Sequence, residues 1–293
     1  MDRRACIKLL GTAGLVSLVG QENACGAETD AEADGCGILV DLTACRGCRK
    51  CEEVCAYVNK LPAPKKVEAE GNVERKTSDS QWTAVSGHET SRGNVFVKNQ
   101  CLHCNTPACA SACLTKALVK TKEGPVVWRA DKCMGCRYCM LSCPFDVPKF
   151  EYNSPVPKIQ KCRMCWDRVV EGRLPACVEF CPNKVLTFGK RNELLEIARA
   201  RIYQNPKKYV SHIYGEREAG GTSVLYLSPV PFEELGFLTK VGEKAYPEYT
   251  AGFLQSVPVV LTLVPAFLLG LNRVTRNAAH PEQDFVEPSS TER

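Results

Sequence analysis

The apolar positions of this chain fall in short runs, with one much longer run near the C-terminus. Short apolar runs bounded by glycine, proline or polar residues are typical of β-strands. They predict strands at 37–42, 117–119, 126–128 and 185–189. The turn signal at 123–125 joins the second and third of these strands into a hairpin.

One amphipathic helix follows the last of these strands. Leu195, Ala198 and Ile202 recur at helical spacing. Asn192 before them is a typical N-cap, and Pro206 after them stops a helix. The pattern therefore predicts a surface helix of about three turns with one apolar face.

The long apolar run, residues 251–271, carries no charge and predicts a transmembrane helix. As a helix it would span about 30 Å, the thickness of a bilayer core. Pro258 and Pro265 would kink it, which membrane helices tolerate. Arg273 and Arg276 follow it, so the positive-inside rule predicts a cytoplasmic C-terminus. The alternative is a buried helix of a soluble domain.

Residues 1–27 resemble a twin-arginine signal peptide. Arg3 and Arg4 precede a mild apolar run at 9–20, and small residues at 24–27 offer a cleavage site. This export route carries proteins that are already folded. The alternative is an uncleaved N-terminal anchor. Cys6 and Cys25 fall in this segment and are expected to carry no chemistry.

The spacing of sixteen cysteines predicts iron–sulfur clusters. The third run has the C-x2-C-x2-C-x3-C-P spacing by which bacterial ferredoxins hold cubane clusters, and the first run repeats it up to the proline. The second is C-x2-C-x4-C-x3-C and the fourth is C-x2-C-x11-C-x3-C-P. In chain order the runs are Cys45, Cys48, Cys51, Cys55; Cys101, Cys104, Cys109, Cys113; Cys133, Cys136, Cys139, Cys143; and Cys162, Cys165, Cys177, Cys181.

The fourth cysteine of such a run ligates a different cluster, so the runs must exchange ligands in pairs. The hairpin predicted between the second and third runs is the link between the halves of a two-cluster ferredoxin. It favours pairing those two runs, which leaves the first and fourth for each other. The segment after Cys143 is rich in proline and predicts no such hairpin. Spacing suggests this nesting without proving it.

Composition narrows the function further. A net charge of +5 without a long basic run does not favour nucleic acid as a partner. Disulfides are disfavoured because C-x2-C neighbours bridge poorly, and zinc knuckles need no third cysteine. No phosphate loop, G-x-G-x-x-G or Ser/His/Asp arrangement predicts a catalytic site. The basic residues beside the cysteines are expected to offset cluster charge: Arg46, Arg49, Lys50, Lys132, Arg137, Lys161 and Arg163.

The remaining residues are assigned no chemistry. Cys36 lies outside every run and is expected to pack as a small apolar residue. His103 lies inside a C-x2-C pair, where a hydrogen-bonding or packing role is expected, and His212 is a weaker ligand candidate. The insertion at 56–100 is interpreted as a surface loop, in which 81–85 could form one strand.

The chain resembles the iron–sulfur subunits that accompany molybdopterin oxidoreductases and hydrogenases. The cysteine runs carry the resemblance, together with Gly135-Cys-Arg-Tyr-Cys-Met, Cys143-Pro-Phe-Asp-Val-Pro and Lys161-Cys-Arg-Met-Cys. The resemblance is more specific to the iron–sulfur subunits of the hydrogenase-2 and Hmc transmembrane-complex type. This rests on segments 214–222 and 230–232, together with the leader and the apolar helix. It extends over residues 1–271.

The resemblance implies four [4Fe–4S] clusters in two pseudo-symmetric ferredoxin-like units of an α+β fold. The implied ligand sets are Cys45, Cys48, Cys51 and Cys181; Cys55, Cys162, Cys165 and Cys177; Cys101, Cys104, Cys109 and Cys143; and Cys113, Cys133, Cys136 and Cys139. The predicted domains are a signal peptide at 1–27, a four-cluster ferredoxin-like domain at 35–190 with the insertion 56–100, a C-terminal extension or partner-docking segment at 191–250, a transmembrane helix at 251–271 and a cytoplasmic tail at 272–293.

The resulting prediction is a non-catalytic electron-transfer subunit. It would lie on the periplasmic side of the inner membrane, between a hydrogenase or multihaem cytochrome and an integral membrane subunit. Two alternatives stay open: a molybdopterin oxidoreductase as partner, and a structural metal-binding or assembly protein.

Overall fold

The computed structural model describes residues 35–65 and 74–279, with the side chains of the last helix as far as residue 276. The predicted signal peptide and the end of the predicted tail, 280–293, lie outside the described residues. The chain divides after Tyr246 into a body and a C-terminal unit. The body mixes helices and strands, as predicted.

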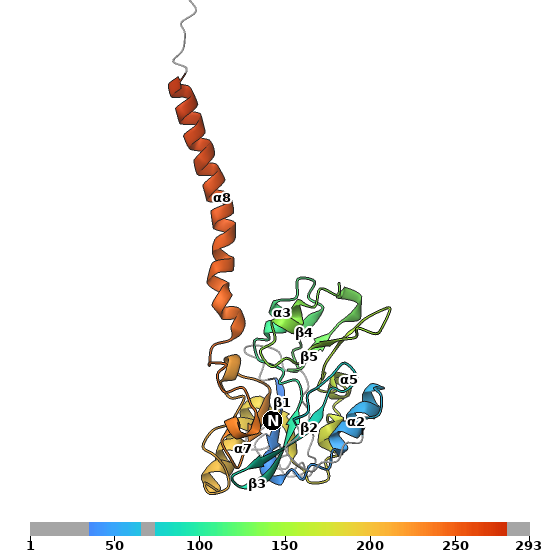
Figure 1. Ribbon diagram of the computed structural model, residues 1–293. Coiled ribbons are helices and arrows are strands. Elements are labelled where there is room, and N and C mark those ends of the chain that lie inside the picture. The colour runs from blue at the N-terminus through green and yellow to red at the C-terminus, as the bar shows by residue number, and fades with distance from the viewer. Residues whose placement is uncertain (1–34, 66–73, 280–293) are drawn as a thin grey trace, which may run out of the picture. The chain divides into compact units, whose positions relative to one another are not determined.

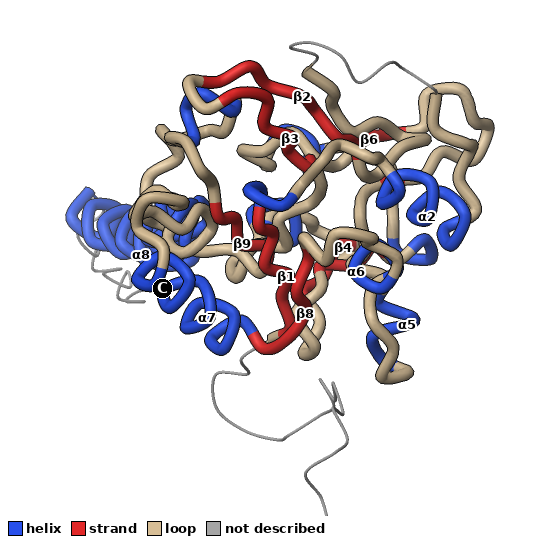
Figure 2. Tube along the Cα trace, turned by 90° about the horizontal axis from the view of Figure 1, so that it is seen from below, coloured by secondary structure: helices blue, strands red, loops and turns tan. Residues whose placement is uncertain are grey.

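A three-stranded sheet runs through the body (Figure 2). Its middle strand is β1 (Cys36–Asp41), which pairs antiparallel with β8 (Leu186–Lys190) and parallel with β9 (Val224–Leu227). Side chains alternate between its faces. Ile38 and Val40 pack with residues of the cysteine loops, whereas Leu39 packs against α7 (Arg191–Gln204). The predicted strands at 37–42 and 185–189 are thus confirmed.

Helix α7 confirms the predicted helix but not its cap. Its N-cap is Lys190, whose side chain makes no capping hydrogen bond. Leu194, Leu195 and Ala198 are buried against the sheet, as the helical spacing required. The helix begins before Asn192 because β8 runs directly into it.

Two short hairpins flank the third cysteine run. β4 (Leu118–Lys120) pairs with β5 (Val126–Trp128), which confirms the predicted hairpin. Together with α3 it lies at one end of the body (Figure 1). β6 (Lys149–Phe150) pairs with β7 (Ile159–Gln160), although no hairpin was predicted there. Its strands are too short to leave a periodic signal, and its prolines lie in the connecting loop or outside the ladder.

The helices that follow the cysteine loops are mostly short. Their bounds are α2 (Lys50–Asn59), α3 (Ala108–Ser111), α4 (Tyr138–Leu141), α5 (Trp166–Val170) and α6 (Ala176–Glu179). Single 3₁₀ turns lie at η1 (Leu42–Ala44), η2 (Ala130–Lys132), η3 (Glu218–Gly220) and η4 (Phe232–Leu235).

The insertion between the first two cysteine runs is largely not a surface loop. It contains the antiparallel pair β2 (Ala84–Thr90) and β3 (Gly93–Asn99). Val95 and Val97 belong to the same apolar core as β1, and Trp82 is buried against cysteines. The interpretation as a loop is wrong because polar residues of this hairpin are buried by tertiary contacts, which hides the hydrophobic pattern.

The C-terminal unit is one long helix, α8 (Tyr246–Ala279), which contains both Pro258 and Pro265. Residues 246–276 are long and apolar enough to cross a membrane, and the most apolar part of this stretch is exposed. The predicted span at 251–271 lies within it. The predicted tail begins inside this helix, because the helix continues past Arg273 and Arg276.

Candidate functional site

All four cysteine runs share one backbone feature, a residue in the left-handed region. The residue just before the second cysteine of each run has a positive φ: +66° at Gly47, +50° at His103, +73° at Gly135 and +52° at Met164. Left-handed residues within such turns direct successive N–H groups into a concave surface, an arrangement found at many iron–sulfur sites. Four segments of different sequence therefore fold into the same kind of loop.

The two glycines of these loops should respond differently to alanine. At Gly135 an added Cβ meets nothing within 4 Å, so Gly135→Ala should cost only the left-handed strain, about 1–2 kcal/mol. At Gly47 the Cβ would lie 2.5 Å from Cδ1 of Phe96. Gly47→Ala should therefore lower the free energy of unfolding by more than Gly135→Ala does. Denaturant unfolding of both variants measures the difference, and equal losses would contradict this account.

Two cavities each collect four cysteines from two different runs. The first, which we call group 1, joins three cysteines of run one to the last of run four; the second, group 4, joins three of run three to the last of run two. Group 1 is Cys45, Cys48, Cys51 and Cys181, and group 4 is Cys113, Cys133, Cys136 and Cys139.

The other eight cysteines form two neighbourhoods that are more buried. Group 2 is Cys55, Cys162, Cys165 and Cys177, and group 3 is Cys101, Cys104, Cys109 and Cys143. Burial raises the pKa of the Cys55 thiol to about 11, with Cys177 adding to the rise. Burial likewise raises the pKa of Cys104 to about 12, with Cys101 and Cys143 adding to it. Burial thus favours the neutral thiol at both groups while they hold no metal.

Three apolar clusters connect the groups in a row. The first packs Cys177 of group 2 against Cys51 of group 1 and its neighbours. The second contains Cys162 of group 2 and Cys101 of group 3. The third contains Cys109 of group 3 and Cys139 of group 4. The order along the body is therefore group 1, group 2, group 3, group 4.

Buried lysines lie at two of the junctions. Lys161 is 3% exposed; its Nζ lies 3.6 Å from Cys101 Sγ and donates to the carbonyl of Cys162 at 2.9 Å. Lys98 is also 3% exposed, lines the group 1 cavity and donates to Gln100. Burial opposes its charge, but Cys177, Cys51 and Cys162 raise the pKa of Lys98 above its ordinary value. Both lysines place positive charge between neighbouring cysteine groups.

The basic residues predicted beside the cysteines have mixed roles. Lys161 is buried as described, whereas Lys50 is paired with Glu53 at the surface. Arg137 lies over the rings of Phe150 and Tyr152, and Arg163 pairs with Asp167. Arg46 and Lys132 are exposed. Lys98 was missed because it belongs to the insertion, far from any cysteine in the sequence.

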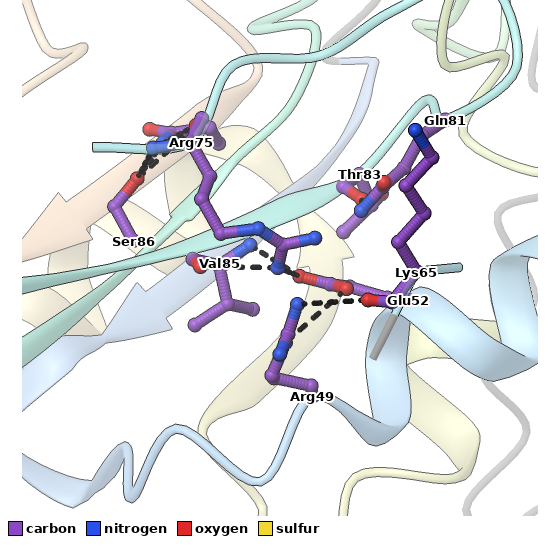
Figure 3. Close-up of polar contacts among 9 residues, drawn as sticks. Arg49, Glu52, Lys65, Arg75, Gln81, Thr83, Val85 and Ser86 are labelled. Atoms are coloured by element: carbon purple, nitrogen blue, oxygen red, sulfur yellow. Dashed lines mark hydrogen bonds and ion pairs between the residues drawn. The ribbon is translucent and has the colours of Figure 1, made fainter. Parts of the chain in front are cut away.

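A buried carboxylate fixes the helix that carries the first run. Glu52, 2% exposed on α2, accepts from the Val85 N–H at 2.6 Å and pairs with Arg75 (Figure 3). Arg49 lies 3.4 Å from its other oxygen. Arg75 and Val85 belong to the insertion, so this network ties α2, with Cys51 and Cys55, to the β2–β3 hairpin.

The segment 214–223 braces the second run. Ser223 donates its N–H to the carbonyl of Leu102 at 3.1 Å, and Asn105 donates to Gly221 at 3.0 Å. The side chain of Arg191 donates to the carbonyl of Thr222 at 2.7 Å. Residues that follow the last cysteine therefore complete a loop that lies a hundred residues earlier in the chain.

His103, His212 and Cys36 belong to none of the four cysteine groups. His103 is fully buried, and its Nδ1 accepts the N–H of Val126 at 2.9 Å, as expected for a hydrogen-bonding residue. His212 contacts Glu218 at 2.7 Å, away from the cysteines. Cys36 is fully buried and disulfide-bonded, so it is more than a small apolar residue but joins no group.

Several buried donors beside the cysteines have no partner among the described residues. They are Trp82 Nε1, Gln100 Nε2, His103 Nε2, Trp128 Nε1 and Arg163 Nε. Native proteins rarely leave such donors unpaired. No set of three or more His, Cys, Asp or Glu side chains in the described ranges is arranged for a single metal ion. Sulfur-rich clusters fit this donor set, since inorganic sulfide accepts hydrogen bonds and four thiols surround each site.

Comparison with known proteins agrees with this geometry. Residues 93–191 match the model of the 4Fe-4S dicluster domain. A protein of Nitratidesulfovibrio vulgaris Hildenborough is 47% identical, over 94% of this chain and 77% of its own length. The hydrogenase-2 operon protein HybA of Escherichia coli O157:H7 is 33% identical, over 98% of this chain and its full length. The chain belongs to the HybA family.

A more distant relative of this HybA-family chain is the iron–sulfur subunit of the nitrate-inducible formate dehydrogenase of Escherichia coli K12. It is 31% identical, over 64% of this chain and 66% of its own. The family resemblance predicted from the cysteine runs is thus confirmed. The dicluster match begins at β3 and ends at the first residue of α7, so it contains the last three runs.

Proposed function

We propose that this chain passes single electrons through four [4Fe–4S] clusters, one held by each cysteine group. Group 1 would use Cys45, Cys48, Cys51 and Cys181; group 2, Cys55, Cys162, Cys165 and Cys177; group 3, Cys101, Cys104, Cys109 and Cys143; and group 4, Cys113, Cys133, Cys136 and Cys139. The chain is an electron-transfer iron–sulfur subunit of a membrane respiratory complex and not its substrate-converting subunit.

The observation that carries the proposal is the row of groups. Each neighbouring pair shares an apolar cluster, which excludes water and keeps the protein between the sites rigid. Cys48 of group 1 and Cys136 of group 4 are exposed, whereas Cys162 and Cys101 of the inner groups are buried. Electrons would therefore enter at one end of the body and leave at the other.

The chain's own residues would bind the clusters, screen them from water and set their potentials. Bound clusters supply reversible one-electron chemistry. Lys98 and Lys161 lie where their charge favours the reduced, more negative state. Packing of α2 on α6, and of α3 on α4, supports two ferredoxin-like units, one with groups 1 and 2 and the other with groups 3 and 4.

The membrane assignment rests on α8. We propose residues 251–271 as a single span with the body on the periplasmic side, supported by Arg273 and Arg276 after the span. The leader at 1–27 would direct export, 191–250 would dock a partner, and 272–293 would be the cytoplasmic tail. Protease added to intact spheroplasts should digest the body. Protection of the body would overturn this sidedness.

The relatives support a catalytic partner and a membrane partner. We propose that a hydrogenase or multihaem cytochrome subunit exchanges electrons with one end and an integral membrane subunit with the other. A formate dehydrogenase relative keeps a molybdopterin enzyme as the second candidate. Co-purification of the tagged chain from membranes distinguishes them.

The decisive experiment is metal analysis of the full chain purified without oxygen. We expect about sixteen iron atoms and as many sulfides per chain, with EPR signals that appear on reduction. Iron-poor protein loaded with zinc would overturn the proposal in favour of a structural metal protein.

A further inference from the structure

The three tryptophans of the body differ in what their indole N–H contacts. Trp166 donates to Oε2 of Glu123 at 3.2 Å. The N–H groups of Trp82 and Trp128 are buried and have no acceptor among the described residues. An indole N–H can only donate a hydrogen bond, so each of these two groups needs a nearby acceptor.

Trp128 is placed directly at group 4. It is the last residue of β5, opposite Leu118 of β4. Its side chain lines the cavity that Cys113, Cys133, Cys136 and Cys139 also line. It packs against the apolar cluster that contains Cys109 and Cys139.

The backbone already donates to sulfur at this group. The N–H of Ala117 lies 3.2 Å from Cys113 Sγ. Thr115 Oγ1 also lies 3.7 Å from Cys113 Sγ. Sulfur therefore already takes part in hydrogen bonding at this group, and sulfur is the acceptor that its four cysteines offer to an indole.

We propose that the indole N–H of Trp128 donates to a sulfur atom of the group 4 cluster and raises its reduction potential. The inference rests on the proposed function. A donor to sulfur stabilises the reduced cluster more than the oxidised one, because the reduced cluster carries more negative charge. Trp128 would set the potential at the exposed end of the row, where electrons are exchanged with a partner.

The test is a redox titration, followed by EPR, of the full chain and of Trp128→Phe, which keeps the ring and removes the donor. The group 4 signal is identified by its loss in Cys136→Ser. We expect Trp128→Phe to retain its iron and to shift this signal alone to a lower potential. The equilibrium constant for reduction should fall about tenfold, which is about 59 mV for one electron. Trp166→Phe, which removes a donor already paired with a carboxylate, should shift it far less.

An unchanged potential in iron-replete Trp128→Phe would overturn the inference while leaving the proposed function intact. Absence of iron from the unaltered chain would instead overturn the proposed function. If Trp128→Phe fails to assemble, the unaltered protein labelled with ¹⁵N-indole provides the answer. A nitrogen hyperfine coupling to the reduced group 4 cluster supports the inference, and its absence overturns it.

Discussion

Replacing Cys136 by serine should remove about a quarter of the iron and stop electron transfer through the chain. Cys136 is an exposed member of group 4. Its loss should therefore disturb one terminal site and leave the buried groups folded. Because the groups lie in a row, losing the terminal one interrupts the whole path. Iron content, EPR and the rate of electron transfer between a soluble donor and the membrane partner measure this.

The matched control is Leu141→Ala. Leu141 lies on the same short helix, α4, and is 83% exposed. This variant should keep its iron and its electron transfer. If Cys136→Ser lost iron but transferred electrons at the normal rate, the groups would not act in series.

Replacing Glu52 by alanine should lower the free energy of unfolding by about 3–5 kcal/mol, the usual cost of removing one partner from a buried ion pair. The change leaves the half-buried Arg75 without its carboxylate and the buried Val85 N–H without this acceptor. It also frees α2 from the β2–β3 hairpin, so iron at groups 1 and 2 should be lost first on heating. Denaturant unfolding and iron release measure the two effects.

The neighbouring residue supplies the control. Glu53 is on the same helix and pairs with Lys50 at 2.9 Å, with both side chains more than half exposed. Exposed pairs of this kind contribute only about 0–1 kcal/mol. Glu53→Ala should therefore be close to the unaltered protein. Similar losses in the two variants would mean that the buried network does not hold α2.

Local signals predicted the parts of this fold that local forces determine. The β4–β5 hairpin follows from its apolar residues and its turn, and α7 follows from its periodicity. The four loops follow from cysteine spacing, because chelation limits how far apart ligands on one loop can lie.

The parts that the sequence did not reveal depend on contacts between distant segments. Lys98 is charged and lies in an insertion, yet the fold buries it beside group 1. β9 has a clear apolar run, Val224–Leu227, but its place beside β1 is a matter of topology. Trp82 and Trp128 read as ordinary apolar residues until their unpaired N–H groups are seen next to cysteines.

The position of β1 has a consequence for biosynthesis. This strand precedes every cysteine run, yet both of its partners are made after the last one. While the ribosome is still translating the middle of the chain, neither β8 nor β9 has been made, so the sheet cannot form. Group 1 is also incomplete until Cys181 emerges. Metal loading of group 1 is therefore expected to be a late event on a nearly finished polypeptide, and premature termination before Cys181 should yield a product that lacks this group.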